Sequence, residues 1–208
     1  RVSGCDMTKI KFCGLSRACD MKAANELMPD YIGFVFVPKS KRYVSPAAAA
    51  ELKGLLVPGI KAVGVFINET PEQIADLLNK GIIDMAQLHG DENENFIRRL
   101  QELTDKPVIK AFRIVTANDI KIANQSAADY ILLDSGAGTG TVFDWDLVKN
   151  IDRPYFLAGG LSPANVPRAV SRLRPYAVDV SSGIEMDGFK SKTKMAAFAA
   201  AIRKEDSL

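Results

Sequence analysis

The stretch "KAVGVFINETPEQIADLLNKG", residues 61–81, contains one complete strand–helix unit. Its first part, residues 61–67, is rich in β-branched and apolar residues, which predicts a buried strand. Thr70 followed by Pro71 predicts the start of a helix, because a threonine oxygen caps the first turn and proline fits the first helical position. Gly81 predicts the end of that helix. The stretch therefore predicts a single βα unit.

The same unit recurs along the whole chain. Strand candidates begin about 22 to 30 residues apart, the length of one βα unit, and cover 8–13, 31–37, 61–67, 82–88, 107–114, 130–134, 154–159 and 176–182. Helical patterns fill the gaps at 46–56 after the capping Ser45, and at 71–81, 92–103, 117–126, 144–151, 163–173 and 192–204. Eight such units predict a single-domain (βα)8 TIM barrel in the α/β class. The alternative, a doubly wound open sheet, usually stops at about five to seven strands.

The barrel domain is expected over residues 8–208, with residues 1–7 as an N-terminal extension or a disordered start. The composition fits one domain of this size, since the chain has 208 residues of which 47% are apolar. The formal charge of +2 is too balanced to indicate a nucleic acid or a membrane surface as a partner. No apolar run approaches the roughly 20 residues that span a bilayer, and the first residues lack the apolar stretch of a signal peptide.

The cysteine and histidine content indicates the compartment and argues against a metal site. Cys5, Cys13 and Cys19 are an odd number without paired spacing, which predicts a reducing, cytoplasmic location. The chain has one histidine, His89, so a zinc site is not expected.

Two side chains at strand ends suggest acid–base chemistry. Cys13 ends the first predicted strand in "KFCGLS" (11–16), and Asp134 ends the sixth in "YILLD" (130–134). Active sites of this fold lie at the carboxyl ends of the strands, where strands one and six are nearly opposite. A thiol and a carboxylic acid on two sides of a bound sugar would suit an isomerase, which removes one proton and donates another. The structural alternatives are that Cys13 is a packing residue and that Asp134 caps a helix or anchors a loop.

Two glycine-containing loops predict a phosphate site. They lie in "LAGGLSPAN" (157–165) and "VDVSSGIE" (178–185), after the last two strands, where barrels often bind phosphate. Glycine lets backbone N–H groups approach an anion closely, and we expect Ser162-Pro163 to open a helix whose N-terminus favours negative charge. The candidate phosphate-binding residues are Gly159, Gly160, Asp179, Ser181, Ser182 and Gly183. A further glycine-rich loop, "SGAGTGTVFDW" (135–145), is expected to be a mobile loop or lid.

Polar residues after the second and fourth predicted strands are substrate-binding candidates. "VPKSKRYVS" (37–45) presents Arg42, whose guanidinium could grip a carboxylate with two hydrogen bonds, although a solvated charge run is the simpler interpretation. "MAQLHGDE" (85–92) places Gln87 and His89 near the mouth, where His89 could orient a polar group of the substrate or cap the next helix.

Taken in order, these motifs resemble those of phosphoribosylanthranilate isomerases, over nearly all of residues 8 to 200. The resemblance rests on "KFCGLS", "GFVFVPKSKRYV", "GVFINE", "QLHGDE", "KAFRI", "LLDSGAGTGTVFDW", "FLAGGLSPANV" and "VDVSSGIE". It implies an Amadori rearrangement in tryptophan biosynthesis with no cofactor or metal, by a monomer or homodimer, on a small phosphorylated substrate. It further implies that Cys13 is the general base, Asp134 the general acid and Arg42 the ligand of the anthranilate carboxylate, with the glycine loops holding the phosphate. Ser191 departs from the aspartate that is frequent there in the family.

Three other functions fit the sequence less well. A sister isomerase of histidine biosynthesis resembles a two-aspartate pattern, which Cys13 does not fit. Indole-glycerol-phosphate synthase relies on catalytic lysines and glutamates, and Lys110 is a poor match because Ala-Phe-Arg follow it within the strand. A non-catalytic barrel that senses a sugar phosphate would not need both Cys13 and Asp134.

The first strand also predicts a buried ion pair. Strand alternation places Lys11 and Cys13 on one side of the strand and Ile10 and Phe12 on the other. An inward Lys11 is costly unless it is paired, and Asp179 on the neighbouring last strand is the available carboxylate. We expect Lys11, Arg42 and the phosphate-binding dipoles to favour the thiolate form of Cys13.

Overall fold

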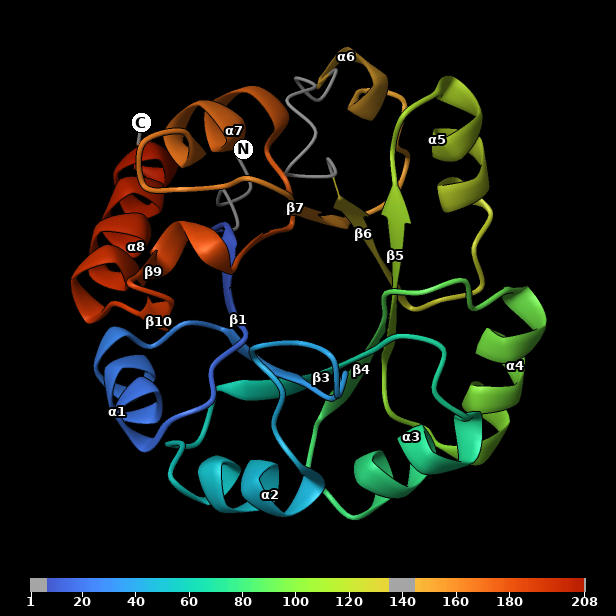
Figure 1. Cartoon of the computed structure of the whole chain (residues 1–208). Coiled ribbons are helices and arrows are strands. Elements are labelled where there is room, and N and C mark those ends of the chain that lie inside the picture. The colour runs from blue at the N-terminus through green and yellow to red at the C-terminus, as the bar shows by residue number, and fades with distance from the viewer. Residues whose placement is uncertain (1–6, 135–144, 208) are drawn as a thin grey trace.

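In the computed structural model the strands form a closed barrel with the helices around it (Figure 1). The structure describes residues 7–134 and 145–207. The strand order is β1-β2-β3-β4-β5-β6-β7-β8, every neighbouring pair is parallel, and β1 pairs with β8 to close the ring. This confirms the predicted (βα)8 barrel and rules out an open sheet. The predicted extension and the predicted lid lie, apart from Met7 and Trp145, outside the described residues.

The barrel strands are β1 (Lys9–Cys13), β2 (Tyr31–Val35), β3 (Lys61–Phe66), β4 (Met85–Leu88), β5 (Val108–Arg113), β6 (Tyr130–Asp134), β7 (Tyr155–Ala158) and β8 (Ala177–Val180). The helices are α1 (Ala18–Leu27), α2 (Pro46–Gly54), α3 (Pro71–Asn79), α4 (Glu94–Leu103), α5 (Ala117–Asn124), α6 (Trp145–Val148), α7 (Val166–Leu173) and α8 (Lys192–Asp206). A 3-10 turn, η1 (Ser182–Ile184), and a small hairpin, β9 (Glu185–Met186) with β10 (Phe189–Lys190), lie between β8 and α8. No described helix is long and apolar enough to cross a membrane.

The predicted helix caps are confirmed. Ser45 and Thr70 accept hydrogen bonds from the backbone N–H groups of Ala48 and Gln73, and proline follows each cap. Ser191 caps α8 by accepting from the backbone N–H of Lys194, so its departure from the family pattern leaves the helix start intact.

The predicted start of α7 is wrong by several residues. We expected the helix to open at Ser162-Pro163, but it begins at Val166. The side chain of Asn165 explains the difference, since it accepts from the backbone N–H of Ser162 and donates to the carbonyl oxygen of Gly160, at 2.8 Å each. These bonds hold residues 160–165 in a turn ahead of the helix.

Apolar side chains pack in two layers, one on each face of the barrel sheet, as strand alternation requires. The larger layer lies between strands and helices, with Phe12 and Ile10 among its members. The inner layer packs in the barrel centre and consists of Tyr31, Val63, Met85, Ile109, Ala111, Leu132, Phe156, Ala158 and Ala177.

An aromatic cluster closes the amino-terminal end of the barrel. Tyr31 and Tyr130 begin their strands and Tyr176 precedes β8, and each packs against another ring of the cluster within 6 Å between centroids. The hydroxyls of Tyr31 and Tyr176 are 2.9 Å apart and hydrogen-bonded. The rings fill the barrel interior at this end, opposite the carboxyl ends of the strands.

A buried ion pair lies inside the seam where the barrel closes. The Nζ atom of Lys11 is 3.0 Å from Oδ1 of Asp179, and the Lys11 side chain has no solvent exposure. The two residues are also register partners of β1 and β8. The predicted pair is thereby confirmed.

Replacing Lys11 by methionine should lower the free energy of unfolding by about 3–5 kcal/mol, because it leaves the Asp179 carboxylate buried without its partner. The double variant Lys11→Met/Asp179→Asn should recover part of that loss. As a control, Lys9→Met breaks the partly exposed pair with Asp30 and should cost less than about 1 kcal/mol. Equal losses for Lys9→Met and Lys11→Met in urea unfolding would contradict the argument.

Candidate active site

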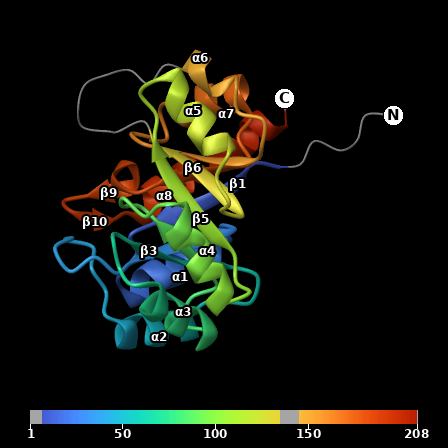
Figure 2. The same cartoon turned by 90° about the vertical axis from the view of Figure 1, so that its right-hand side faces the viewer.

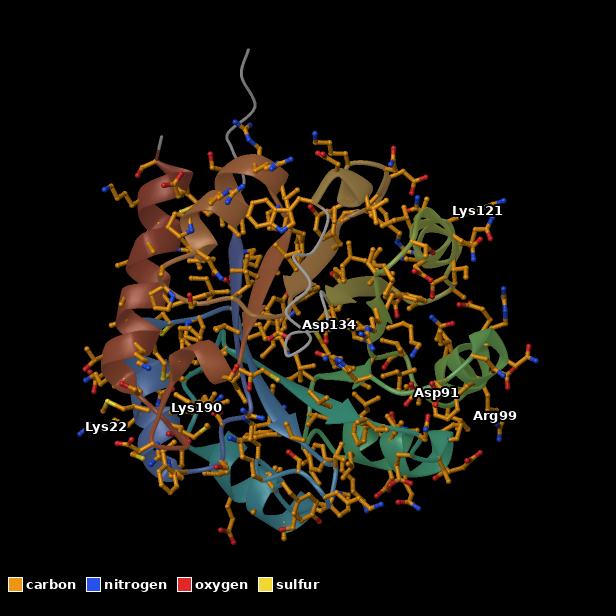
Figure 3. The ribbon with its side chains drawn as sticks, turned by 45° about the horizontal axis from the view of Figure 1, so that its top comes forward. Lys22, Asp91, Arg99, Lys121, Asp134 and Lys190 are labelled. Carbon is orange, nitrogen blue, oxygen red and sulfur yellow. The ribbon has the colours of Figure 1, made fainter. Side chains whose placement is uncertain are left out.

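A cavity of about 360 Å³ opens at the carboxyl ends of the strands. Figure 3 shows Asp134 in the central part of the molecule, at this end of β6. Every site residue predicted from the sequence lines the cavity except Gly183. The full lining is Cys13, Val35, Val37, Ser40, Arg42, Val65, Ile67, Gln87, His89, Asp134, Ala158, Gly159, Gly160, Leu161, Asp179, Val180, Ser181 and Ser182.

Cys13 ends β1 with its sulfur packed against the backbone of β2. A Cβ atom at Gly33 would lie 2.6 Å from Sγ of Cys13, so the thiol occupies the space that a side chain would take there. Burial raises the pKa of Cys13, and the nearby charge of Lys11 opposes this without cancelling it. Lys11 favours the thiolate as expected, but the net pKa is raised, because the expectation left out the cost of desolvating the anion.

Asp134 and His89 face each other across the cavity wall. Nε2 of His89 is 3.1 Å from Oδ2 of Asp134, and Nδ1 of His89 is 2.9 Å from Nε2 of Gln87. If the Gln87 amide donates to Nδ1, the neutral ring carries its proton on Nε2 and donates it to Asp134. Oε1 of Gln87 is buried and has no partner among the described residues, which leaves an acceptor for a bound molecule.

The two predicted phosphate loops lie side by side on the same rim. Gly159 and Gly160 have positive φ angles of 93° and 62°, a conformation that a side chain would strain. A Cβ atom at Gly183 would lie 1.9 Å from the carbonyl oxygen of Leu161, so only glycine lets the loop after β8 approach the loop after β7 this closely. Gly183 does not line the cavity but joins the loops that do.

Arg42 does grip a carboxylate with two hydrogen bonds, but the carboxylate belongs to the protein. Its Nε and Nη2 atoms donate to Oε1 and Oε2 of Glu185 at 2.6 and 3.0 Å. Lys190 donates to the same carboxylate at 2.8 Å and to Oγ and the backbone oxygen of Ser181 at 3.1 and 2.8 Å. The loops after β2 and β8 are thus joined by ion pairs whose side chains are 3% to 24% exposed.

Glu185 and Lys190 were missed in the sequence reasoning. Glu185 ends the "VDVSSGIE" motif, and Lys190 directly precedes Ser191. The available signal was an acidic residue inside a predicted phosphate loop, which is unfavourable for an anion site unless cations neutralise it.

Other charged residues near the mouth have structural roles. Lys110 pairs with Glu92 at 3.1 Å and donates to the carbonyl oxygen of Gly90 at 2.6 Å, outside the cavity lining. This supports its rejection as a catalytic lysine. Among residues 7–134 and 145–207, no group of three or more His, Cys, Asp or Glu side chains is placed to hold a metal ion.

Comparison with known proteins gives one consistent result. Residues 10–201 match the family model described as N-(5'phosphoribosyl)anthranilate (PRA) isomerase. The chain is 43% identical over 204 residues to N-(5'-phosphoribosyl)anthranilate isomerase of Caldanaerobacter subterraneus subsp. tengcongensis, which covers 95% of this chain and 98% of that one.

Solved structures agree with the sequence comparison. The phosphoribosyl anthranilate isomerase of Thermotoga maritima superposes with a TM-score of 0.86 at 37% identity, covering 95% of this chain and all 100% of that one. A structure of the enzyme in complex with reduced 1-(o-carboxyphenylamino)-1-deoxyribulose 5-phosphate superposes with a TM-score of 0.83 at 36% identity and the same coverage.

Iodoacetamide should alkylate the exposed Cys19 before the buried Cys13 in the ligand-free protein near neutral pH, because only the thiolate reacts. The rate at Cys13 should keep rising with pH above the range where an ordinary thiol ionises, since its pKa is raised. Peptide mapping separates the two sites and Cys5. Faster alkylation of Cys13 than of Cys19 at pH 7 would show that its pKa is lowered instead.

Proposed function

The chain belongs to the N-(5′-phosphoribosyl)anthranilate isomerase family, and on this premise we propose its reaction and the residues that perform it. The reaction is the Amadori rearrangement of N-(5-phospho-β-D-ribosyl)anthranilate to 1-(2-carboxyphenylamino)-1-deoxy-D-ribulose 5-phosphate, in tryptophan biosynthesis. The observation that carries this proposal is that Cys13 and Asp134 line one cavity from nearly opposite strands, beside two glycine loops. The set supplies a base, an acid and an anion site.

Asp134 is proposed as the general acid that opens the furanose ring. It donates a proton to the ring oxygen while the bond from that oxygen to C1 breaks, and the nitrogen lone pair forms the Schiff base. His89, 3.1 Å from the carboxyl group, holds the acid toward the cavity. The neutral ring, with Nδ1 accepting from the Gln87 amide and the proton on Nε2, donates to Asp134 and so orients the carboxyl group without taking its acidic proton.

Cys13 is proposed as the general base that removes the proton from C2. The resulting enolamine then takes a proton at C1 and loses one from the C2 hydroxyl, so that the net reaction neither gains nor releases a proton. Cys13 must be the thiolate to accept the proton, and the charge of Lys11 favours that form. Lys11 itself stays paired with Asp179.

The two ends of the substrate fit two parts of the cavity. The phosphate is assigned to the backbone and hydroxyl donors of Gly159, Gly160, Ser181 and Ser182, with Gly183 as the contact that brings the loops together. The aromatic ring is assigned to the apolar wall formed by Val35, Val65 and Ile67, and its carboxylate to Arg42.

Gln87 and Asp179 have further proposed roles in the cavity. Gln87 carries a buried, unpartnered oxygen and is a candidate to accept a hydrogen bond from the sugar. Asp179, predicted among the phosphate-binding residues, is better suited to support the site from below, because its charge is already matched by Lys11. Independence from cofactors, the monomer or homodimer state and the cytoplasmic location stay predictions.

The function is tested by mixing the protein with chemically formed phosphoribosylanthranilate and following the change in its anthranilate fluorescence. We expect multiple turnovers to the aminoketose. The product is identified by its chromatographic retention time against the synthetic compound, because substrate and product have the same mass. Binding without turnover would favour a sugar-phosphate sensor and contradict the proposal. Turnover of the aminoimidazole substrate of histidine biosynthesis alone would favour the sister isomerase.

Asp134→Asn should lower kcat by at least about 10²-fold, because the amide keeps the shape of the acid but has no proton to transfer. The same fluorescence assay measures the effect, and circular dichroism checks the fold. Asp129→Asn, a change to another carboxylate that flanks β6 at its opposite end, serves as the control. A variant at Asp134 with nearly normal kcat would exclude this residue as the acid.

A further inference from the structure

The side chain of Arg42 is held at one edge before any substrate arrives. Its Nε and Nη2 atoms both bond to Glu185, whereas no hydrogen bond from Nη1 to another part of the described chain is found. The aliphatic stem lies against the backbone after β1, since a Cβ atom at Gly14 would meet Cδ of Arg42 at 2.5 Å. A guanidinium can bind one carboxylate through its Nε edge and a second through its terminal edge.

Glu185 is built to stay in place. Its side chain is 9% exposed and its carboxylate contacts Arg42, Lys190 and, at 3.7 Å, Lys41. Burial by itself would raise the pKa of Glu185, but the hydrogen bonds and charges of Arg42 and Lys190 outweigh it and lower the pKa to about 2. The carboxylate is therefore ionised throughout the neutral range.

The cluster also reaches the proposed phosphate loop. Lys190, whose side chain is 3% exposed, bonds both to Glu185 and to Ser181. Figure 2 shows the β9–β10 hairpin, which carries both charged residues, extending from one end of the barrel. A single carboxylate thus links the group proposed to hold one end of the substrate with the loop proposed to hold the other.

We propose that Glu185 is a positioning residue that fixes Arg42 by its Nε edge, so that the terminal edge points into the cavity and orients the substrate carboxylate relative to Cys13 and Asp134. This inference rests on the proposed function and deepens it, since it explains how the guanidinium is aimed. Glu185 itself does not touch the reacting atoms.

The two effects of removing the Glu185 charge differ in direction. Without Glu185, Arg42 loses its orientation, so the bound substrate is misplaced and the chemical step slows. At the same time a negative charge near the substrate carboxylate disappears, which favours binding. The expected signature is therefore a lower kcat without a loss of affinity, whereas general damage to the site would weaken both.

The test compares the wild type with Glu185→Gln in the phosphoribosylanthranilate assay. We expect kcat to fall by about tenfold, within the range that a misplacement of the substrate by less than 1 Å would produce. The Kd for reduced 1-(o-carboxyphenylamino)-1-deoxyribulose 5-phosphate, measured by calorimetry, should stay the same or decrease. An unchanged kcat, or a Kd that rises in proportion to the fall in kcat, would overturn the proposal.

A second arm asks whether Glu185 acts through Arg42. In an Arg42→Met background the change Glu185→Gln should have a much smaller further effect on kcat, because there is no guanidinium left to orient and only the ion pair with Lys190 is lost. An equal further loss in that background would also overturn the proposal. Glu185→Asp, which keeps the charge on a shorter side chain, should retain more kcat than Glu185→Gln and is the variant to use if the amide does not fold.

The matched control is Asp206→Asn. It removes another poorly exposed carboxylate from an arginine, Arg203, beside Thr8 at the opposite end of β1. It should lower the unfolding free energy and leave kcat within about twofold, since it does not touch the cavity. If the wild type itself shows no turnover, the proposed function fails. If the wild type is active and Glu185→Gln behaves like Asp206→Asn, only the inference about Glu185 fails.

Discussion

The barrel depends on the pairing of its first strand with its last, and a buried ion pair lies inside that seam. Lys11 and Asp179 are register partners, and each points into the barrel. A slip of β1 by one residue would turn Lys11 toward the helix layer, away from Asp179, and break the pair, so the pair opposes other registers. The seam also brings Cys13 next to the loop that contains Ser181 and Ser182, although the chain separates them by most of its length.

Charges at the mouth repeat the same arrangement, whereas the opposite end is held by rings. Glu92 binds Lys110 and Glu185 binds Arg42, so that each carboxylate joins segments from different βα units. Buried ion pairs often add little net stability compared with apolar residues of the same size, but they demand a particular geometry. The aromatic cluster around Tyr31 and Tyr176 contributes burial instead. The amino-terminal end of the barrel therefore contributes apolar burial, and the carboxyl-terminal end holds polar groups in fixed positions.

The sequence predicts features that depend on neighbouring residues better than those that depend on distant ones. Strand β6 was predicted with its observed bounds because its apolar run ends at Asp134, a charged residue. The start of α7 was missed because the turn held by Asn165 resembles a helix start at the level of sequence. The partner of Arg42 could not be predicted, since Glu185 lies 143 positions away and no local pattern connects them. Alternation and strand order, in contrast, were enough to pair Lys11 with Asp179.

The ion pair in the seam also affects the proposed mechanism, because Lys11 limits the rise in the pKa of Cys13. A higher pKa makes each thiolate a stronger base, but it reduces the thiolate population by more than it increases basicity, because proton-transfer rates depend only partly on base strength. Cys13 occupies an inward-facing position at the end of β1 and is buried against Gly33. The charge of Lys11 contributes most to counteracting the effect of burial on the pKa of Cys13. An apolar pair could close the seam about as stably, but it would remove the charge that does most to limit the rise in the pKa of the proposed base.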